Sequence, residues 1–177
     1  MAGLLKTLDA LADPRQRPEV RPGLKLDHLN RKTALVLFAV AEAVLGEDFL
    51  ARAPRFIEIV DDYLNYQRPA QREQFLVALL IAETRTFNLL VGGRPKGFSH
   101  MSLAERRHVL ERLRASRQEL NRNLYAAFVN VSASTYYASD LTWPDLGYPG
   151  VSVDHPEILN QPPPVPWRPG DPRPIEP

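Results

Sequence analysis

The sequence predicts an all-α protein, a single bundle-like domain of about six helices followed by an extended, proline-rich C-terminal arm. Apolar residues recur at helical spacing, and no segment shows the alternation expected of a strand. Of the chain's 17 prolines, 9 fall within the last 23 residues, a composition typical of polyproline II or disordered segments. The predicted organisation is a short helix and linker at 1–29, a helical domain at 30–140, and an aromatic turn with the extended arm at 141–177.

The first predicted helix is short and amphipathic, and it ends before Pro14 because the residue before a proline disfavours the helical conformation. Residues 13–23 contain three prolines and are expected to form an extended linker. The second helix covers residues 30–45 and ends at Gly46. It is apolar on nearly every side, which predicts a central position in the bundle.

The third helix begins near Pro54, because proline is favoured in the first turn of a helix. Its apolar residues follow helical spacing, and Glu58, Asp61 and Asp62 are expected on the opposite, solvated face. The fourth helix covers residues 70–91 and contains an uninterrupted apolar run at 75–82. The stretch VGGRPKG then ends it.

The fifth helix begins with a capping box, in which the Ser102 hydroxyl accepts from the amide of Glu105 and the Glu105 carboxylate accepts from the amide of Ser102. The sixth helix covers roughly residues 118–137. The sequence leaves open whether the fifth and sixth helices are continuous across residues 115–117.

Composition excludes several kinds of site. The chain has no cysteine, so disulfides, thiolate metal sites and cysteine nucleophiles are impossible. A formal net charge of +1 favours neither nucleic acid nor a membrane as a partner, and no apolar tract is long enough for a direct membrane span. Neither a signal peptide nor a twin-arginine motif is recognisable, so a cytoplasmic location is expected, or a periplasmic one only if a partner carries the chain there.

No catalytic, cofactor-binding or metal-binding residue is predicted. Glu105 and His108 have the Glu-x-x-His spacing of di-iron bundles, but the chain contains no second such motif. A metalloenzyme built around this pair stays as a minor alternative. Six arginines are expected to form a solvated, salt-bridged basic face: Arg106, Arg107, Arg112, Arg114, Arg117 and Arg122.

The stretch YYASDLTWPDLGYPG, residues 136–150, instead suggests a binding surface. Its aromatic side chains are rigid and amphipathic, as at many binding hot spots, and two of them precede a proline that restrains the backbone. The alternative is that some of these side chains fold back and cap the helical core, and the two roles can coexist. The predicted partner-binding residues are Tyr136, Tyr137, Trp143, Tyr148, Pro149 and Trp167.

Residues 98–150 resemble the gluconate 2-dehydrogenase small-subunit family, and the match extends in outline upstream to about Asn30. The same arrangement is similar to the N-terminal helical extension of long-chain fatty alcohol oxidases. The residues that carry the resemblance are Phe98, Leu103, Arg107, Arg122, Leu124, Tyr125, Phe128, Tyr136, Tyr137, Trp143, Gly147, Tyr148, Pro149 and Gly150.

The resemblance implies a partner rather than a reaction. Members of this family accompany, or are fused to, a large FAD-dependent oxidoreductase of the glucose–methanol–choline (GMC) class that oxidises alcohols or sugars. The chain itself is then expected to bind no cofactor and to stabilise the FAD-containing large subunit. Many small subunits carry a twin-arginine signal, which this sequence lacks, so an export role does not carry over.

A second hypothesis comes from the arm. The segment PPVPWR, residues 163–168, has the proline-rich form that aromatic-grooved modules bind. The chain would then be a free-standing helical adaptor that binds its partners through the proline-rich tail.

Overall fold

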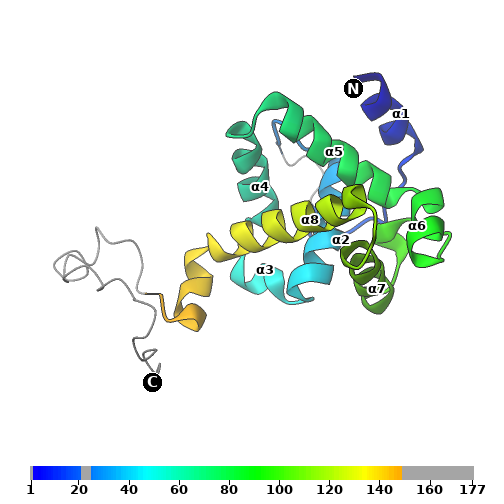
Figure 1. Ribbon diagram of the computed structural model, residues 1–177. Helices are drawn as coiled ribbons and strands as arrows, with labels where there is room; N and C mark the ends of the chain where they lie inside the picture. The colour runs from blue at the N-terminus through cyan, green and yellow to red at the C-terminus, as the bar shows by residue number, and fades with distance from the viewer. Residues whose placement is uncertain (1, 21–24, 149–177) are drawn as a thin grey trace, which may run out of the picture. The chain divides into compact units, whose positions relative to one another are not determined.

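The computed structural model describes residues 2–20 and 25–148, and every regular element among them is helical (Figure 1). The all-α prediction is confirmed. The chain divides into two compact units, Met1–Thr142 and Trp143–Pro177. The elements are, in order, α1 (Ala2–Leu11), α2 (Arg31–Leu45), α3 (Phe49–Arg52), α4 (Phe56–Asn65), α5 (Pro69–Glu83), α6 (Arg85–Gly92), the 3₁₀ turn η1 (Phe98–His100), α7 (Leu103–Arg114), α8 (Glu119–Tyr137) and the 3₁₀ turn η2 (Asp140–Leu146).

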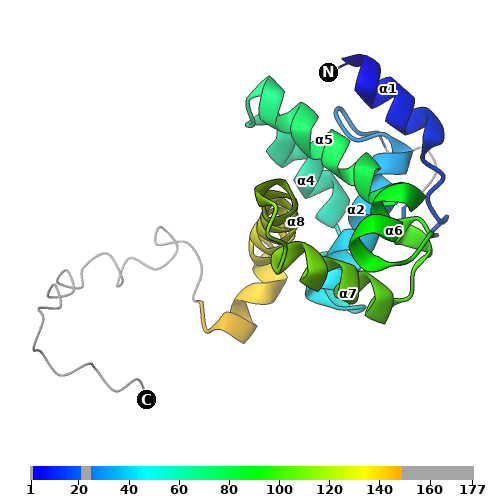
Figure 2. The ribbon, with the colours of Figure 1, turned by 45° about the vertical axis from the view of Figure 1, so that its right-hand side comes forward.

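Helix α2 is the centre of the first unit, as its apolar composition predicts. Every residue from Thr33 to Ala43 is buried, and α5, α7 and α8 all pack against it. Asn30 begins the helix by accepting a hydrogen bond from the Thr33 amide at 2.9 Å. Figure 1 shows α8 crossing in front of α2, and in the turned view of Figure 2 α2 lies between α8 and α6. Helix α1 packs along α5 on the outside of the bundle.

The predicted helix at 70–91 is in fact two helices, α5 and α6, which meet at 77°. The break is at Thr84, whose backbone is extended. It leaves helix-terminal carbonyls without helical partners, and side chains take two of them: the Thr84 hydroxyl donates to the Ile81 carbonyl and the Asn88 amide donates to the Ala82 carbonyl, both at 2.8 Å. The break turns Glu83 away from the helix and into a polar cluster.

The described part of the predicted linker, residues 13–20, contains no helix or strand and ends in a turn at 18–20, and it is tied to the bundle. Val20 is fully buried, and the Arg17 guanidinium contacts the Glu42 carboxylate at 2.9 Å. On the other side of the undescribed residues 21–24, Asp61 accepts hydrogen bonds from the amides of Asp27, His28 and Leu29 at 2.7–3.0 Å. Asp61 is buried for this reason, so the expectation that it faces solvent was wrong.

The last two helices of the first unit are separate. Helix α7 ends at Arg114 and α8 begins at Glu119, and the Arg122 guanidinium holds the intervening loop through the carbonyls of Ser116 and Arg117. The predicted capping box at the start of α7 is present, with both of its hydrogen bonds. Within the described residues, no single helix has the length and apolar composition to cross a membrane, although the bent pair α5 and α6 does when its two helices are taken together.

Candidate functional site

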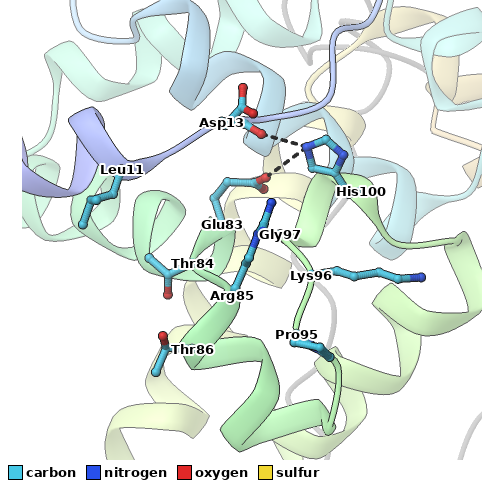
Figure 3. A pocket seen from close by; sticks show the side chains of 10 residues that line it. All are labelled: Leu11, Asp13, Glu83, Thr84, Arg85, Thr86, Pro95, Lys96, Gly97 and His100. Atoms are coloured by element: carbon cyan, nitrogen blue, oxygen red, sulfur yellow. Dashed lines mark hydrogen bonds and ion pairs between the residues drawn. The ribbon is translucent and has the colours of Figure 1, made fainter.

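A buried carboxylate, Glu83, lies at the C-terminal end of α5. Only 4% of the residue is exposed, and its two oxygens accept hydrogen bonds from the Ser99 amide at 2.9 Å and the Ser99 hydroxyl at 2.8 Å. The ring of His100 lies 4.0 Å away, on the opposite side of the carboxylate from the helix (Figure 3). Burial raises the pKa of Glu83 above its usual value, and the hydrogen bonds from Ser99 oppose that shift.

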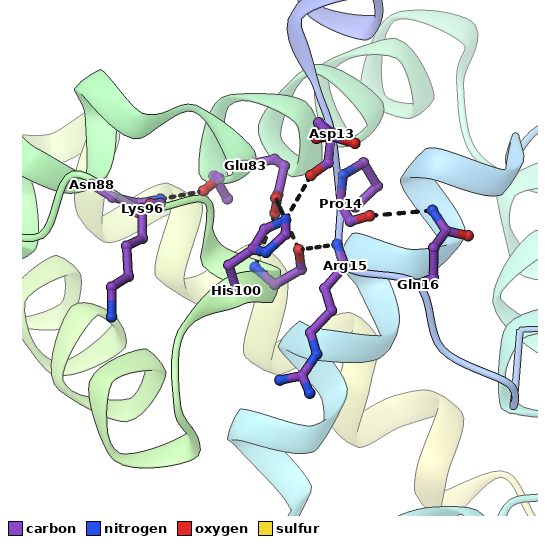
Figure 4. Close-up of polar contacts among 10 residues, drawn as sticks. Asp13, Pro14, Arg15, Gln16, Glu83, Asn88, Lys96 and His100 are labelled. Atoms are coloured by element: carbon purple, nitrogen blue, oxygen red, sulfur yellow. Dashed lines mark hydrogen bonds and ion pairs between the residues drawn. The ribbon is translucent and has the colours of Figure 1, made fainter.

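The same cluster holds the N-terminal segment against the bundle. The Arg15 amide donates to the Ser99 hydroxyl oxygen at 2.7 Å, and His100 Nε2 donates to the Asp13 carbonyl at 2.7 Å. Figure 4 shows these contacts converging from the N-terminal segment, α5 and η1. Glu83 therefore connects three segments that are far apart in the sequence.

A hollow of about 590 Å³ opens beside this cluster, and Arg85 and Lys96 are among its lining residues. Its groups do not form a nucleophile relay. The Ser99 hydroxyl donates directly to Glu83, while His100 Nε2 donates to a backbone carbonyl rather than accepting the serine proton. The hydrogen bonds of Glu83, Ser99 and His100 instead hold segments of the fold together, and we call these three residues the Glu83 latch.

A second buried cluster surrounds Glu42 of α2. Its Oε2 contacts the guanidinium groups of Arg106 at 2.6 Å and Arg17 at 2.9 Å, and Arg106 also donates to the Ala39 carbonyl. Arg106 is only 3% exposed, so the expectation that it belongs to a solvated basic face was wrong. A carboxylate in an apolar helix needs such partners, and this one takes an arginine from α7 and another from the N-terminal segment.

Glu105 and His108 do not form a metal site with other described residues. Glu105 accepts from the Ser102 amide at 2.9 Å and lies 3.6 Å from Lys96 Nζ. His108 is exposed on the same helix. Within the described ranges, no group of three or more His, Cys, Asp or Glu side chains is placed to hold a metal ion.

Two of the predicted partner-binding residues lie in the last turn of α8. Tyr136 is partly buried and packs against the core, whereas Tyr137 is 49% exposed. Their rings meet edge to face, with centroids 5.2 Å apart. Leu141, just beyond the helix, is 50% exposed. Tyr136 thus packs as a cap on the core, and Tyr137 is half exposed at the end of α8.

Two more predicted residues lie in the described part of the second unit. Trp143 and Tyr148 meet edge to face at 5.2 Å, and the Tyr148 amide donates to the Trp143 carbonyl at 3.0 Å. Gly147 between them has a φ of +63°, which favours glycine and closes the turn. Leu146 and Tyr148 are about half exposed. Pro149 and Trp167 lie outside the described residues.

Sequence reasoning did not find an apolar groove between α5, α6 and α8. Its volume is about 500 Å³, and Phe75, Ile81, Phe87, Leu120 and Leu124 are among the residues that line it. The sequence signal for this groove is the apolar run at 75–82. Consecutive residues point to all sides of a helix, so the side chains of this run cannot all lie on one buried face. Leu120, which lines the groove on α8, is 77% exposed.

Comparison of the chain with family models, with curated proteins and with solved structures finds no match.

Proposed function

We propose that this chain is a non-catalytic accessory subunit that binds and stabilises an FAD-containing oxidoreductase of the GMC class. The flavin and the substrate would both be held by the large subunit. In this proposal the chain contributes a preformed helical scaffold, and it contacts the large subunit through exposed aromatic side chains near its C-terminal end.

The proposal rests on one observation. Of the residues that carry the family resemblance, some are buried in the core and others are exposed at the surface. Phe98 and Phe128 are buried, and the Arg107 guanidinium donates to the Ala43 carbonyl, so folding accounts for these three. Tyr137 and Tyr148 are 49% and 46% exposed. Rigid aromatic side chains that are partly exposed are typical of binding hot spots, and this supports the proposal for Tyr137 and Tyr148.

The energetics of such a surface are favourable. Edge-to-face pairing fixes the Tyr136–Tyr137 and Trp143–Tyr148 rings before any partner arrives, so little side-chain entropy remains to be lost. Covering a half-exposed tyrosine or leucine then contributes on the order of 1 kcal/mol each.

Co-expression with a GMC-type flavoprotein from the same organism tests the proposal. We expect the two chains to co-purify, and the flavoprotein to be less soluble when expressed alone. The double variant Tyr137→Ser/Tyr148→Ser should lower the co-purified fraction by about tenfold or more. The matched control is Tyr66→Ser, since Tyr66 is 87% exposed at the end of α4. Equal loss in both variants, or a flavoprotein that is fully soluble and active alone, contradicts the proposal.

Deletion of residues 155–177 separates this function from the adaptor hypothesis. An accessory subunit that binds through Tyr137 and Tyr148 keeps measurable affinity for its partner after the deletion. An adaptor that binds through PPVPWR loses all binding.

A further inference from the structure

We infer that the groove between α5, α6 and α8 is a second docking surface, and that its occupant is an acidic amphipathic helix of a partner protein. This site is independent of the proposed function, because it uses neither Tyr137 nor the second unit and does not depend on which enzyme the partner is.

The packing leaves the groove open. Helices α5 and α8 both pack on α2, and α5 packs in addition on α1 and α6. Leu76 and Leu80 of α5 face α1, and Phe75 and Leu79 belong to the core. Ala78 and Ile81 lie on a third side of the same helix, and they line the groove. Both residues are only partly buried, and Ala78 also packs against the core, so the bundle covers this third side of α5 incompletely.

The groove continues into a neighbouring hollow of about 660 Å³ between α6 and the α7–α8 loop. The two hollows share Phe87 and Asn121, so together they form one channel, which has a mainly apolar part at the groove and a mixed polar and apolar part at the neighbouring hollow. Leu90 and Leu120 stand at its edge and are 78% and 77% exposed. Side chains as exposed and as apolar as these mark binding sites when they border a hollow.

The charges along the channel identify the kind of partner. Among the described residues that line the two hollows, the charged side chains are Arg112 and Arg117, and the rest are apolar, small or amide-bearing. Arg112 is anchored by its Nε, which donates to the Val91 carbonyl at 3.1 Å. Neither arginine has a carboxylate partner within the described ranges. Glu119 lies on the first turn of α8 but does not line either hollow.

An occupant that matches this surface presents apolar side chains at helical spacing, with carboxylates that flank them. A strand could not add to this face by backbone pairing, because the elements around the groove are all helical. A helix laid in the channel covers Leu90 and Leu120 and brings its carboxylates within reach of Arg112 and Arg117. Opposite charges would then orient the partner and raise the rate of association.

Three designed peptides of about 18 residues, or five helical turns, test the inference. All three carry leucine at helical spacing, and the flanking positions are glutamate, glutamine or lysine. Binding to the full chain is measured by fluorescence anisotropy at low and high salt. We expect the affinities to fall in the order glutamate, glutamine, lysine, and the preference for glutamate to weaken with salt.

Two variants locate the binding. Leu120→Ser should weaken the glutamate peptide by about tenfold, which is the loss expected for one uncovered leucine. The double variant R112E/R117E should reverse the order of the three peptides. The matched controls are Leu11→Ser, at a residue 71% exposed at the end of α1, and R31E/R55E, at two exposed arginines outside the channel. Thermal unfolding monitors the fold of every variant.

Several results overturn the inference. They are no binding of the glutamate peptide, equal binding of the glutamate and lysine peptides, and equal effects of the channel variants and their controls. A wild-type chain that sediments as a dimer, and becomes a monomer in Leu120→Ser, would show that a second copy occupies the channel instead.

Discussion

At the scale of single residues, the buried polar groups show what the sequence does and does not predict. Glu42, Asp61, Glu83 and Arg106 are all buried, and each is held by a specific partner. Helical periodicity placed Asp61 and Arg106 on solvated faces, because periodicity records only the average polarity of a face. The partners of Asp61 are backbone amides, and those of Arg106 are the Glu42 carboxylate and the Ala39 carbonyl. All of them come from distant segments, which spacing along one helix cannot reveal.

The Glu83 latch predicts a pH dependence of stability. Because burial raises the folded-state pKa of Glu83, the folded protein holds this proton more tightly than the unfolded chain does. The contribution of Glu83 to stability is therefore greatest below about pH 4.5, its unfolded value. It decreases as the pH rises from there through the raised pKa.

Urea unfolding of the wild type and of Glu83→Gln at pH 4.5 and pH 7.5 measures this effect. The glutamine is always neutral, so the stability difference between the wild type and the variant should shrink as the pH rises. Glutamine has one acceptor oxygen where the carboxylate has two, so it can accept only one of the two Ser99 hydrogen bonds, and this loss adds an offset at both pH values. A difference that grows with pH would show that Glu83 is not held in a desolvated site.

The close approach at Gly97 predicts a steric effect at the same place. A Cβ at this position would overlap Glu83 Oε1 and would lie 3.0 Å from the Glu83 carbonyl. We expect Gly97→Ala to lower the unfolding free energy by about 1–3 kcal/mol, as overpacking does. Gly3→Ala is the control, because a Cβ there meets nothing within 4 Å in α1. Equal stability of the two variants would show that the backbone at Gly97 is free to move.

At the scale of elements, the sequence predicted a helix cap correctly but did not predict a break within a helix. The capping box of α7 was predicted correctly because all of its groups lie within four consecutive residues. The division of 70–91 into α5 and α6 was missed, because Thr84 and Asn88 act on carbonyls freed by a tertiary bend. The groove lined by α5 and α8 was missed for a related reason, since an apolar run does not say which of its sides another helix covers.

The capping box predicts the opposite pH trend from the latch. The hydrogen bond from the Ser102 amide lowers the pKa of Glu105, and Lys96 and Arg94 lower it further. The stability that the ionised carboxylate contributes is present above about pH 4.5 and is lost as the pH falls through the lowered pKa.

The variant Glu105→Gln keeps an acceptor for the Ser102 amide but has no charge, so its stability should approach that of the wild type as the pH falls below 4.5. Ser102→Ala should instead cost about 1 kcal/mol at every pH, as the loss of an N-cap does. Urea unfolding between pH 2.5 and pH 7 checks both. An unchanged gap between the wild type and Glu105→Gln would contradict the role of charge at this cap.

At the scale of the whole molecule, the all-α class and the central position of α2 follow from the sequence. Periodicity and the apolar content of residues 33–43 are strong signals, and the structure has both features. The half-exposed Tyr137 and Tyr148 lie in the stretch 136–150, which stands out in the sequence because it gathers aromatic residues beside Gly and Pro. Which of them cap the core and which stay exposed depends on packing, and that could not be predicted.

The central claim is that Tyr137 and Tyr148 belong to an interface with a flavoprotein. The most direct test is sedimentation of the purified full chain mixed with the purified GMC-type holoenzyme, followed at the flavin absorbance. We predict a flavin-containing species heavier than the holoenzyme alone, which is lost in Tyr137→Ser/Tyr148→Ser and retained in Tyr66→Ser. A flavin boundary that the wild-type chain does not move would contradict the claim.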